Sequence, residues 1–324
     1  MGTAVVTAPQ QTRSRKLVKL LRDGDQIAHL VTFLFAASVF LVTVFLVYEL
    51  WIHSGPSRTK FGFSFLTGKT WDPVAEQFGA LPFIYGTVLT SIIALLISVP
   101  LGVGAAIFLS ELAPPKVSNA CTFLVELLAA VPSVIFGLLA IFTLVPIMRR
   151  YVEPFLKHTL GFLPQFQGPA YGVGYLSAGL ILSIMTFPFI ISISREALLS
   201  VPREQREAAL ALGATKWEST WQVVVPYARL GILGSIFLAL ARALGETMAV
   251  TMVIGNDTGI HTSLLSPGYT IAAIIANEFT EATGDVHLSA LVELGLVLFA
   301  LTMVLNAAAQ LLIVATTGKG SKQP

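Results

Sequence analysis

Six long runs of apolar residues, separated by more polar connections, dominate the pattern of the chain. Each run has the roughly 20 residues that an α-helix needs to cross about 30 Å of hydrocarbon. An open sheet in lipid would leave backbone groups without partners, so each run predicts a helix. The first is too long and too far from the N-terminus for a simple cleaved signal. The predicted spans cover about 28–52, 83–110, 119–147, 171–194, 228–255 and 288–316.

The composition agrees with this pattern. Hydrophobic residues make up 55% of the 324 residues and charged residues only 12%, against about 25% charged residues in a soluble domain. The predicted fold class is an all-α integral membrane protein with six transmembrane helices. The expected organisation is a basic cytoplasmic N-terminal tail at 1–22, the first membrane helix and an external segment at 23–82, a five-helix core at 83–316 and a cytoplasmic C-terminal tail at 317–324.

The positions of Lys and Arg predict the orientation. If the N-terminus is cytoplasmic, the cytoplasmic segments contain more of these residues than the external ones, as the positive-inside rule requires. Both termini are therefore expected in the cytoplasm. The cytoplasmic group is Arg13, Arg15, Lys16, Lys19, Arg22, Lys116, Arg195, Arg203, Arg206, Lys216, Lys319 and Lys322, and the external group is Arg58, Lys60, Lys69, Arg149, Arg150 and Lys157.

Three of the predicted spans contain an internal proline, which removes a backbone donor and tends to kink a helix. Hydroxyl side chains lie near two of these prolines. Kinks beside hydroxyls are consistent with a polar path through the membrane, but also with hydroxyls that bond back to their own helix. The prolines are Pro100, Pro132 and Pro188, and the hydroxyls are those of Ser133, Ser183 and Thr186.

The longest cytoplasmic connection lies between the fourth and fifth spans and predicts two short helices. Pro202 suits a first helical turn, and Gly213 suits the position after a helix C-cap. Thr215 and Glu218 form the S/T-x-x-E pattern of a capping box, which starts the second helix. Pro226 is expected to limit the end of that helix.

This connection, at about 195–227, resembles the EAA loop of bacterial ABC-importer permeases. The family pattern is E-A-A, three residues, G, nine residues, I, one residue, L-P, and both aliphatic positions hold valine here. Without this spacing, a pair of amphipathic helices on the membrane surface would be the alternative. The matching positions are Glu207, Ala208, Ala209, Gly213, Val223, Val225 and Pro226.

The resemblance implies the architecture of a type I (MetI-like) ABC-importer permease. In that family the loop docks in a cleft of a separate ATP-hydrolysing subunit, so ATP and Mg would be bound by the partner and this chain would need no cofactor and would not be an enzyme. In the string "GFSFLTGKT", Gly62 is one position too far from "GKT" for the phosphate-loop spacing, and the string lies on the predicted external side.

The stretch "ARALGETMAV" places two charges inside the fifth predicted span. On one continuous helix, Ser235, Ala239, Arg242 and Glu246 would share a stripe. An unaccompanied charge at this depth costs at least about 2.5–3.5 kcal/mol on insertion scales. The two charges are thus either a buried ion pair that holds helices together, or part of a water-accessible pathway in which Arg242 binds an oxyanion.

Longer strings make the resemblance more specific. "RALGETMAVTMVIGN" and "WDPVAEQFGALPFIYGTVLTS", together with the EAA loop, resemble a permease subunit of the bacterial phosphate-specific ABC importers, namely the permease that pairs with PstA. The similarity runs from about Leu21 to the end of the sixth span. It implies a phosphate pathway that involves Arg242 and Glu246. From the residues alone, another oxyanion such as sulfate or molybdate stays possible, because one arginine recognises charge more than identity.

The same resemblance implies the partners. They are a PstA-like second permease, a homodimeric PstB-like ATPase and a PstS-like phosphate-binding protein, all at the bacterial plasma membrane with its lipid. No basic stripe interleaved with aromatics indicates a nucleic-acid partner. An intramembrane metalloenzyme is disfavoured because the sequence has no H-E-x-x-H motif and its five histidines are not paired at ligand spacing.

Two further candidates for the pathway lie in the third predicted span. Glu126 lies about two turns before Pro132, and Ser133 follows it. A salt bridge to a neighbouring helix is the alternative for Glu126. The third external connection, 256–287, contains acidic residues but neither Lys nor Arg, so it is either a solvated acidic surface or a docking surface for an external partner.

Overall fold

A computed structural model describes residues 24–317, with side chains from 28 to 311. The predicted tail at 1–22 lies outside the described residues, as does the C-terminal tail after Thr317. The chain forms two compact units that divide after Ile52. The first unit contains α2 (Gly24–His53), which confirms the first predicted span.

Helix α2 satisfies its own hydroxyl groups. Thr32 donates to the carbonyl of Ala28 at 2.8 Å, and Thr43 donates to that of Val39 at 2.9 Å. Bonds of this kind remove the cost of placing a hydroxyl group in hydrocarbon. The helix is therefore suited to a membrane in spite of its polar residues.

The second unit begins with short elements that form an aromatic cluster. The ring of Trp71 meets those of Phe78 and Phe83 edge to face, with centroids 4.7 and 5.0 Å apart. Such pairs add to the stabilisation that burial of the rings provides. The elements are α3 (Gly55–Phe61), α4 (Ser64–Thr67), β1 (Trp71–Asp72) and β2 (Gln77–Phe78), and the two strands pair antiparallel.

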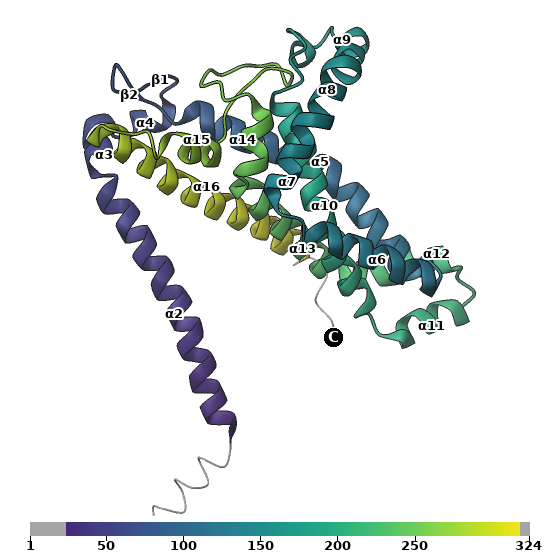
Figure 1. Ribbon diagram of the computed structural model, residues 1–324. Helices are drawn as coiled ribbons and strands as arrows, with labels where there is room; N and C mark the ends of the chain where they lie inside the picture. Colours follow the sequence, from purple (N-terminus) through teal and green to yellow (C-terminus); the bar gives the residue numbers. More distant parts are fainter. Residues whose placement is uncertain (1–23, 318–324) are drawn as a thin grey trace, which may run out of the picture. The chain divides into compact units, whose positions relative to one another are not determined.

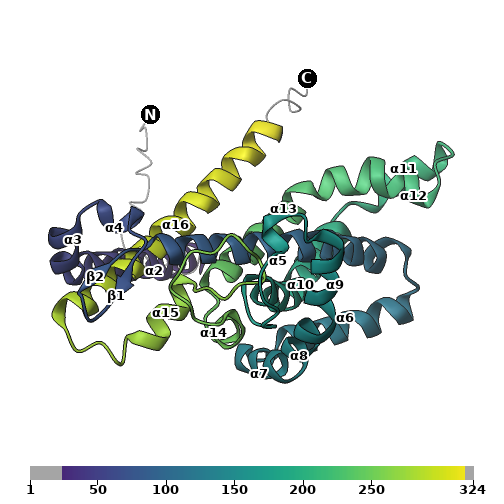
Figure 2. The same cartoon turned by 90° about the horizontal axis from the view of Figure 1, so that it is seen from above.

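Helices α5 (Leu81–Ile107) and α10 (Tyr175–Leu199) run beside each other through the second unit (Figures 1 and 2). Glycines permit the close approach: an added Cβ at Gly102 would lie 2.7 Å from a methyl carbon of Ile190. Small residues at helix crossings are the usual means of packing in membranes, where lipid competes with apolar side chains. Pro100 and Pro188 lie inside these helices without interrupting them.

The third predicted span, 119–147, is corrected by the structure. Helix α6 (Pro115–Ala129) ends before Pro132, and a new helical segment begins at Ser133 and continues to Leu160. Proline lacks the donor that the helix would require and disfavours helical geometry in the residue before it. The new segment consists of α7 (Ser133–Leu139), η2 (Ala140–Leu144), α8 (Val145–Ile147), η3 (Met148–Val152) and α9 (Glu153–Leu160).

The fifth predicted span, 228–255, is also corrected. Helical structure begins earlier, at Lys216, and ends at Gly245. Glu246 has extended backbone geometry, and a new helix, α14 (Met248–Ile254), follows. The segment before Gly245 consists of α12 (Lys216–Ser219), the π-helix η5 (Thr220–Val224) and α13 (Val225–Gly245).

Six helical segments in the described residues are long and apolar enough to cross a membrane, which confirms the predicted number. The buried core of the second unit joins α5, α7, α10 and α14 through side chains such as Tyr175, Met185 and Val250. The remaining elements are η1 (Phe108–Leu112), η4 (Pro164–Phe166), α11 (Arg203–Ala211), α15 (Ile271–Glu278) and α16 (Asp285–Thr317).

Candidate functional site

Helices α11 and α12 form a hairpin whose turn follows from local sequence signals. The N–H of Gly213 donates to the carbonyl of Leu210 at 3.0 Å, and the N–H of Ala214 donates to that of Ala209 at 3.1 Å. These two bonds define a Schellman motif. Gly213 has a φ of +91°, which side chains with a Cβ rarely adopt. The predicted role of Gly213 as the residue after the C-cap is confirmed.

The capping box that starts α12 is also confirmed. The N–H of Glu218 donates to the Thr215 hydroxyl at 3.3 Å, and the N–H of Thr215 donates to the Glu218 carboxylate at 2.8 Å. The prediction that Pro226 ends the second helix is wrong. It lies in the first turn of α13, where its missing N–H is tolerated, so helical structure continues from α12 through η5 into the membrane span.

Thr215→Val is expected to loosen the start of α12. The valine keeps the shape but removes the hydroxyl that caps the helix, which costs about 1 kcal/mol. Amide hydrogen exchange of residues 216–219 should accelerate about fivefold. Thr159→Val is the matched control, because that hydroxyl donates to carbonyls of its own helix, α9. Unchanged exchange in Thr215→Val would contradict the stabilising role of the box.

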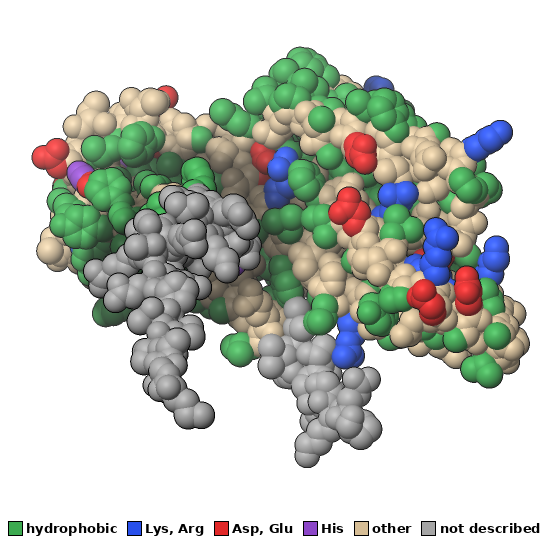
Figure 3. All heavy atoms as spheres, turned by 90° about the horizontal axis from the view of Figure 1, so that it is seen from below, with side chains coloured by type: hydrophobic (Ala, Val, Ile, Leu, Met, Phe, Trp, Pro, Cys, Tyr) green, Lys and Arg blue, Asp and Glu red, His purple; other side chains and the backbone are tan. Residues whose placement is uncertain are grey.

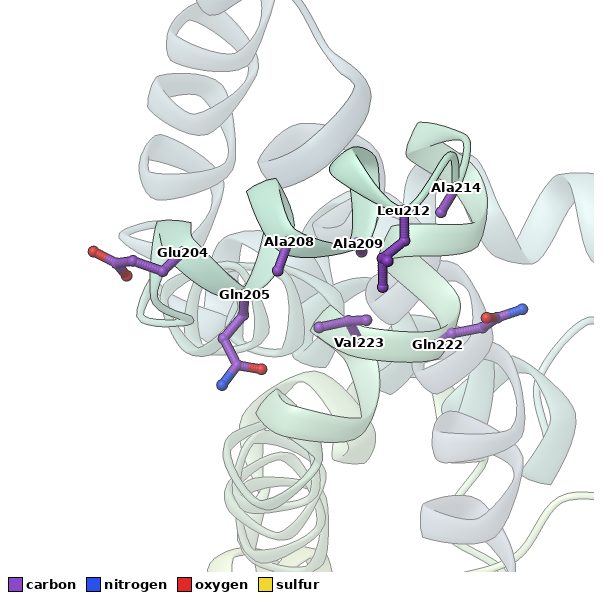
Figure 4. A pocket seen from close by; sticks show the side chains of 8 residues that line it. All are labelled: Glu204, Gln205, Ala208, Ala209, Leu212, Ala214, Gln222 and Val223. Atoms are coloured by element: carbon purple, nitrogen blue, oxygen red, sulfur yellow. The ribbon is translucent and has the colours of Figure 1, made fainter.

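A groove lies between α11 and η5 (Figure 4). The small side chains of Ala208 and Ala209 leave this space open, and Val223 faces it from η5. Glu207 is exposed on α11. Helix α11 thus presents the matched E-A-A positions partly to solvent and partly to the groove. The other lining residues are Glu204, Gln205, Leu212, Ala214 and Gln222.

The hairpin is exposed at one end of the second unit, away from β1, β2 and α15 (Figure 1). Leu212, at the turn, is 90% exposed. Seen from below, side chains of Lys, Arg, Asp and Glu gather over the part that α6, α11 and α12 occupy (Figure 3). An exposed leucine beside a groove and charged groups has the chemistry of a protein contact, in which apolar anchors are surrounded by polar groups.

Arg242 lies on α13, near its end, and is partly buried. Its guanidinium carbon lies 4.3 Å from the centroid of the Phe189 ring on α10, a cation–π contact. Within residues 28–311, its Nε is buried and has no hydrogen-bond partner. The structure therefore holds the guanidinium in place by stacking and leaves at least one donor without an acceptor.

Glu246 does not share the helical stripe expected for it, because α13 ends at Gly245. Among the described residues no ion pair joins Arg242 to Glu246, so the predicted close pair is absent from this conformation. Glu246 is partly buried at the break, and its carboxylate lies 3.5 Å from the N–H of Ala249. The two charged residues are thus four positions apart in the sequence, but Arg242 lies on a helix whereas Glu246 lies in extended backbone.

Ser235 is buried, and its hydroxyl lies 2.8 Å from that of Ser194 on α10. It therefore joins α13 to α10. Ser183 and Thr186 donate to the carbonyls of Leu180 and Leu182 in their own helix, which is the structural alternative considered for these hydroxyls.

The two candidates around Pro132 are separated by the break in the chain. Glu126 is exposed on α6 and lies outside the segment from Ser133 to Leu160 that is long enough to span a membrane. Ser133 begins α7 and is partly buried. Among the described residues, neither side chain forms a hydrogen bond or ion pair with Arg242.

A cluster on the side opposite the hairpin was missed from the sequence. The Glu278 carboxylate accepts a hydrogen bond from the Trp71 indole at 2.9 Å and lies 2.9 Å from the His287 ring, which stacks on Phe78. Trp71 and Glu278 are 207 positions apart, so local patterns carry no signal for this contact. Part of the acidic third connection is thereby used to join β1, α15 and α16.

A phenol near this cluster is held neutral by its surroundings. Burial raises the pKa of Tyr269, while a hydrogen bond from the Asn277 amide to its hydroxyl, at 2.6 Å, opposes this rise. Because the unperturbed pKa is already about 10, Tyr269 carries no charge at neutral pH. A cleft beside the cluster is lined by Pro73, Val74, Glu76, Glu278, Glu281, Thr283, Gly284 and His287.

Comparisons with known proteins place this geometry in a family. The model of the family described as binding-protein-dependent transport system inner membrane component matches residues 98–315. The chain is 48% identical over 293 residues to the phosphate transport system permease protein PstC of Mesorhizobium japonicum, which covers 89% of this chain and 90% of that protein. It is 49% identical over 262 residues to PstC of Xylella fastidiosa, which covers 80% and 81%.

A solved structure shares the fold. A chain in the crystal structure of a bacterial alginate ABC transporter, in complex with a periplasmic protein bound to an alginate pentasaccharide, has a TM-score of 0.58 and 16% sequence identity, covering 90% of this chain and 96% of that chain. The predicted ABC-importer permease architecture is thus confirmed. The chain belongs to the family of binding-protein-dependent transport system inner membrane components and, within it, to the PstC permeases.

Proposed function

We propose that this chain is a transmembrane permease subunit of an ATP-driven phosphate importer and forms half of its translocation pathway. The observation that carries this proposal is 48% identity to a phosphate transport system permease across 89% of the chain. The relatives are named for phosphate, which favours this anion over sulfate or molybdate. The six spans and the exposed hairpin provide the parts that such a subunit requires.

The hairpin of α11 and α12 couples the permease to a separate ATPase. In this proposal a homodimeric PstB-like subunit binds ATP and Mg and receives the hairpin in a cleft, so this chain itself hydrolyses nothing. The rigid turn at Gly213, the capping box at Thr215 and the exposed Leu212 support this role. A rigid unit can transmit a displacement that a flexible loop would absorb.

Arg242 binds the passing anion in the pathway. Its guanidinium is held by Phe189 and retains a buried donor without an acceptor. A phosphate oxygen would satisfy that donor with a charge-assisted hydrogen bond. Glu246, close by in the chain, disfavours tight retention of the anion by repulsion, so the phosphate can leave.

The remaining partners meet other surfaces of the chain. A PstA-like permease forms the second half of the pathway, and a PstS-like protein delivers phosphate to the external side, to which this proposal assigns the cleft lined by Glu278. The importer resides in the bacterial plasma membrane with both termini of this chain in the cytoplasm. An even number of spans agrees with termini on one side.

Complementation in cells tests the proposed substrate. The chain and its partner subunits are expressed in a bacterium that lacks its own phosphate-specific ABC importer. We expect restored accumulation of radiolabelled phosphate at low external concentration and unchanged accumulation of radiolabelled sulfate. Membranes that contain the complex but accumulate no phosphate would contradict the assignment.

A further inference from the structure

Arg206, on α11, contacts two other elements at once. Its Nε and one Nη donate to the two carboxylate oxygens of Glu111 at 3.2 and 2.9 Å. The same guanidinium donates to the carbonyls of Val201 at 2.5 Å and Leu198 at 2.7 Å. A forked contact with one carboxylate and two further carbonyls fixes both the position and the plane of the group.

These acceptors lie where the membrane helices meet the hairpin. Glu111 belongs to η1, at the end of the second span, and Leu198 is at the end of α10. The side chains of Arg206 and Glu111 are only 20% and 11% exposed. Partial burial protects this pair from the screening that makes most surface ion pairs weak. Arg206 also places its charge near helix C-terminal carbonyls, where a cation is stabilising.

Helix α10 continues from this contact to the proposed anion site. It joins α13 through the hydroxyls of Ser194 and Ser235, 2.8 Å apart, and it carries Phe189, on which Arg242 stacks. A continuous series of contacts thus leads from α11, through Arg206 and α10, to Arg242. The EAA spacing leaves position 206 unassigned, because the pattern begins at Glu207.

We propose that Arg206 is a positioning residue that transmits displacement of α11 to α10 and to the second span. This proposal rests on the proposed coupling function of the hairpin. When the ATPase moves α11, the forked contact makes the ends of both membrane helices follow. If Arg206 is absent, α11 still binds the ATPase, but its movement no longer reaches Arg242 efficiently.

The test compares transport with ATP hydrolysis in the complete importer. Wild type, Arg206→Lys and Glu111→Gln complexes, with all partner subunits, are purified and placed in proteoliposomes with the phosphate-binding protein outside. Arg206→Lys keeps the charge but loses the fork that reaches all acceptors together. Arg229→Lys is the matched control, since it makes the same change at an exposed position on α13, outside the hairpin.

We expect normal amounts of bound ATPase, hydrolysis within about twofold of wild type, and about tenfold less phosphate transported per ATP in Arg206→Lys and Glu111→Gln. The double variant should lose no more than either single one, because both remove the same contact. Arg229→Lys should behave as wild type.

Three results would overturn the proposal. They are an unchanged ratio of phosphate to ATP in both single variants, additive losses in the double variant, or loss of the ATPase from both single variants, which would make the contact one of assembly. Absence of phosphate uptake in the wild-type complex is a separate result, because it would refute the proposed function before the role of Arg206 arises.

Discussion

Arg242→Gln is expected to abolish ATP-dependent phosphate uptake and to leave the importer assembled. Glutamine keeps a donor but loses the positive charge and the planar group that stacks on Phe189. Hydrogen bonds to charged groups contribute about 1.5–3 kcal/mol each, so uptake should fall by about a hundredfold. The measurement is the initial rate of radiolabelled phosphate uptake, with co-purification of the partner subunits to report assembly.

The matched control for this prediction is Arg229→Gln. Arg229 lies on the same helix, α13, and is exposed. Its replacement removes the same charge without removing the stacked guanidinium, so uptake should stay within about twofold of wild type. Equal uptake in Arg242→Gln and wild type would give Arg242 a structural role only.

Gly213→Val is expected to weaken association with the ATPase and thereby to suppress uptake. The φ of +91° at Gly213 would cost a branched residue about 1–2 kcal/mol or more, although open space surrounds the position. The turn between α11 and α12 would change, and the hairpin would present a different surface. Retention of the ATPase on the purified permease should fall about five- to thirtyfold.

Gly234→Val is the control that separates backbone conformation from added volume. Gly234 is exposed on α13, has ordinary helical geometry, and an added Cβ there would also meet nothing within 4 Å. We expect this variant to retain the ATPase. Equal retention in Gly213→Val would mean that the Schellman turn is not needed for docking.

Local signals in the sequence were sufficient to predict the hairpin. Gly213 ends α11 and Thr215 starts α12 because both act through backbone groups within a few residues. Six spans were likewise predictable, since hydrophobic length is a property of each segment alone. The family was recognisable from sequence strings that combine the local signals of the hairpin with the apolar runs of the spans.

The breaks at Pro132 and Glu246 were not predictable from hydropathy. An apolar run does not reveal where a helix stops inside a membrane, because non-helical backbone at that depth depends on the protein packed around it. Val131 precedes Pro132, and the residue before a proline disfavours helical geometry, which indicated a possible helix end. A kinked but continuous helix was the simpler expectation. Neither Glu246 nor Thr247 indicated that the helix would end at Gly245. The prediction that Arg242 and Glu246 share one helical stripe was wrong for that reason.

Contacts between distant segments were also missed. Arg206 and Glu111 are 95 positions apart, and neither residue belongs to a recognised pattern. Trp71 and Glu278 are joined only because β1 and α15 pack together. The sequence shows which residues are charged, whereas the fold determines which of them meet.

The most direct test of the phosphate-permease assignment is transport by the purified importer. Proteoliposomes contain the chain, its partner permease and the ATPase, with ATP inside and the phosphate-binding protein outside. We expect ATP-dependent uptake of radiolabelled phosphate that arsenate, a similar tetrahedral oxyanion, inhibits and sulfate does not. An assembled complex that hydrolyses ATP but takes up no phosphate would contradict the account.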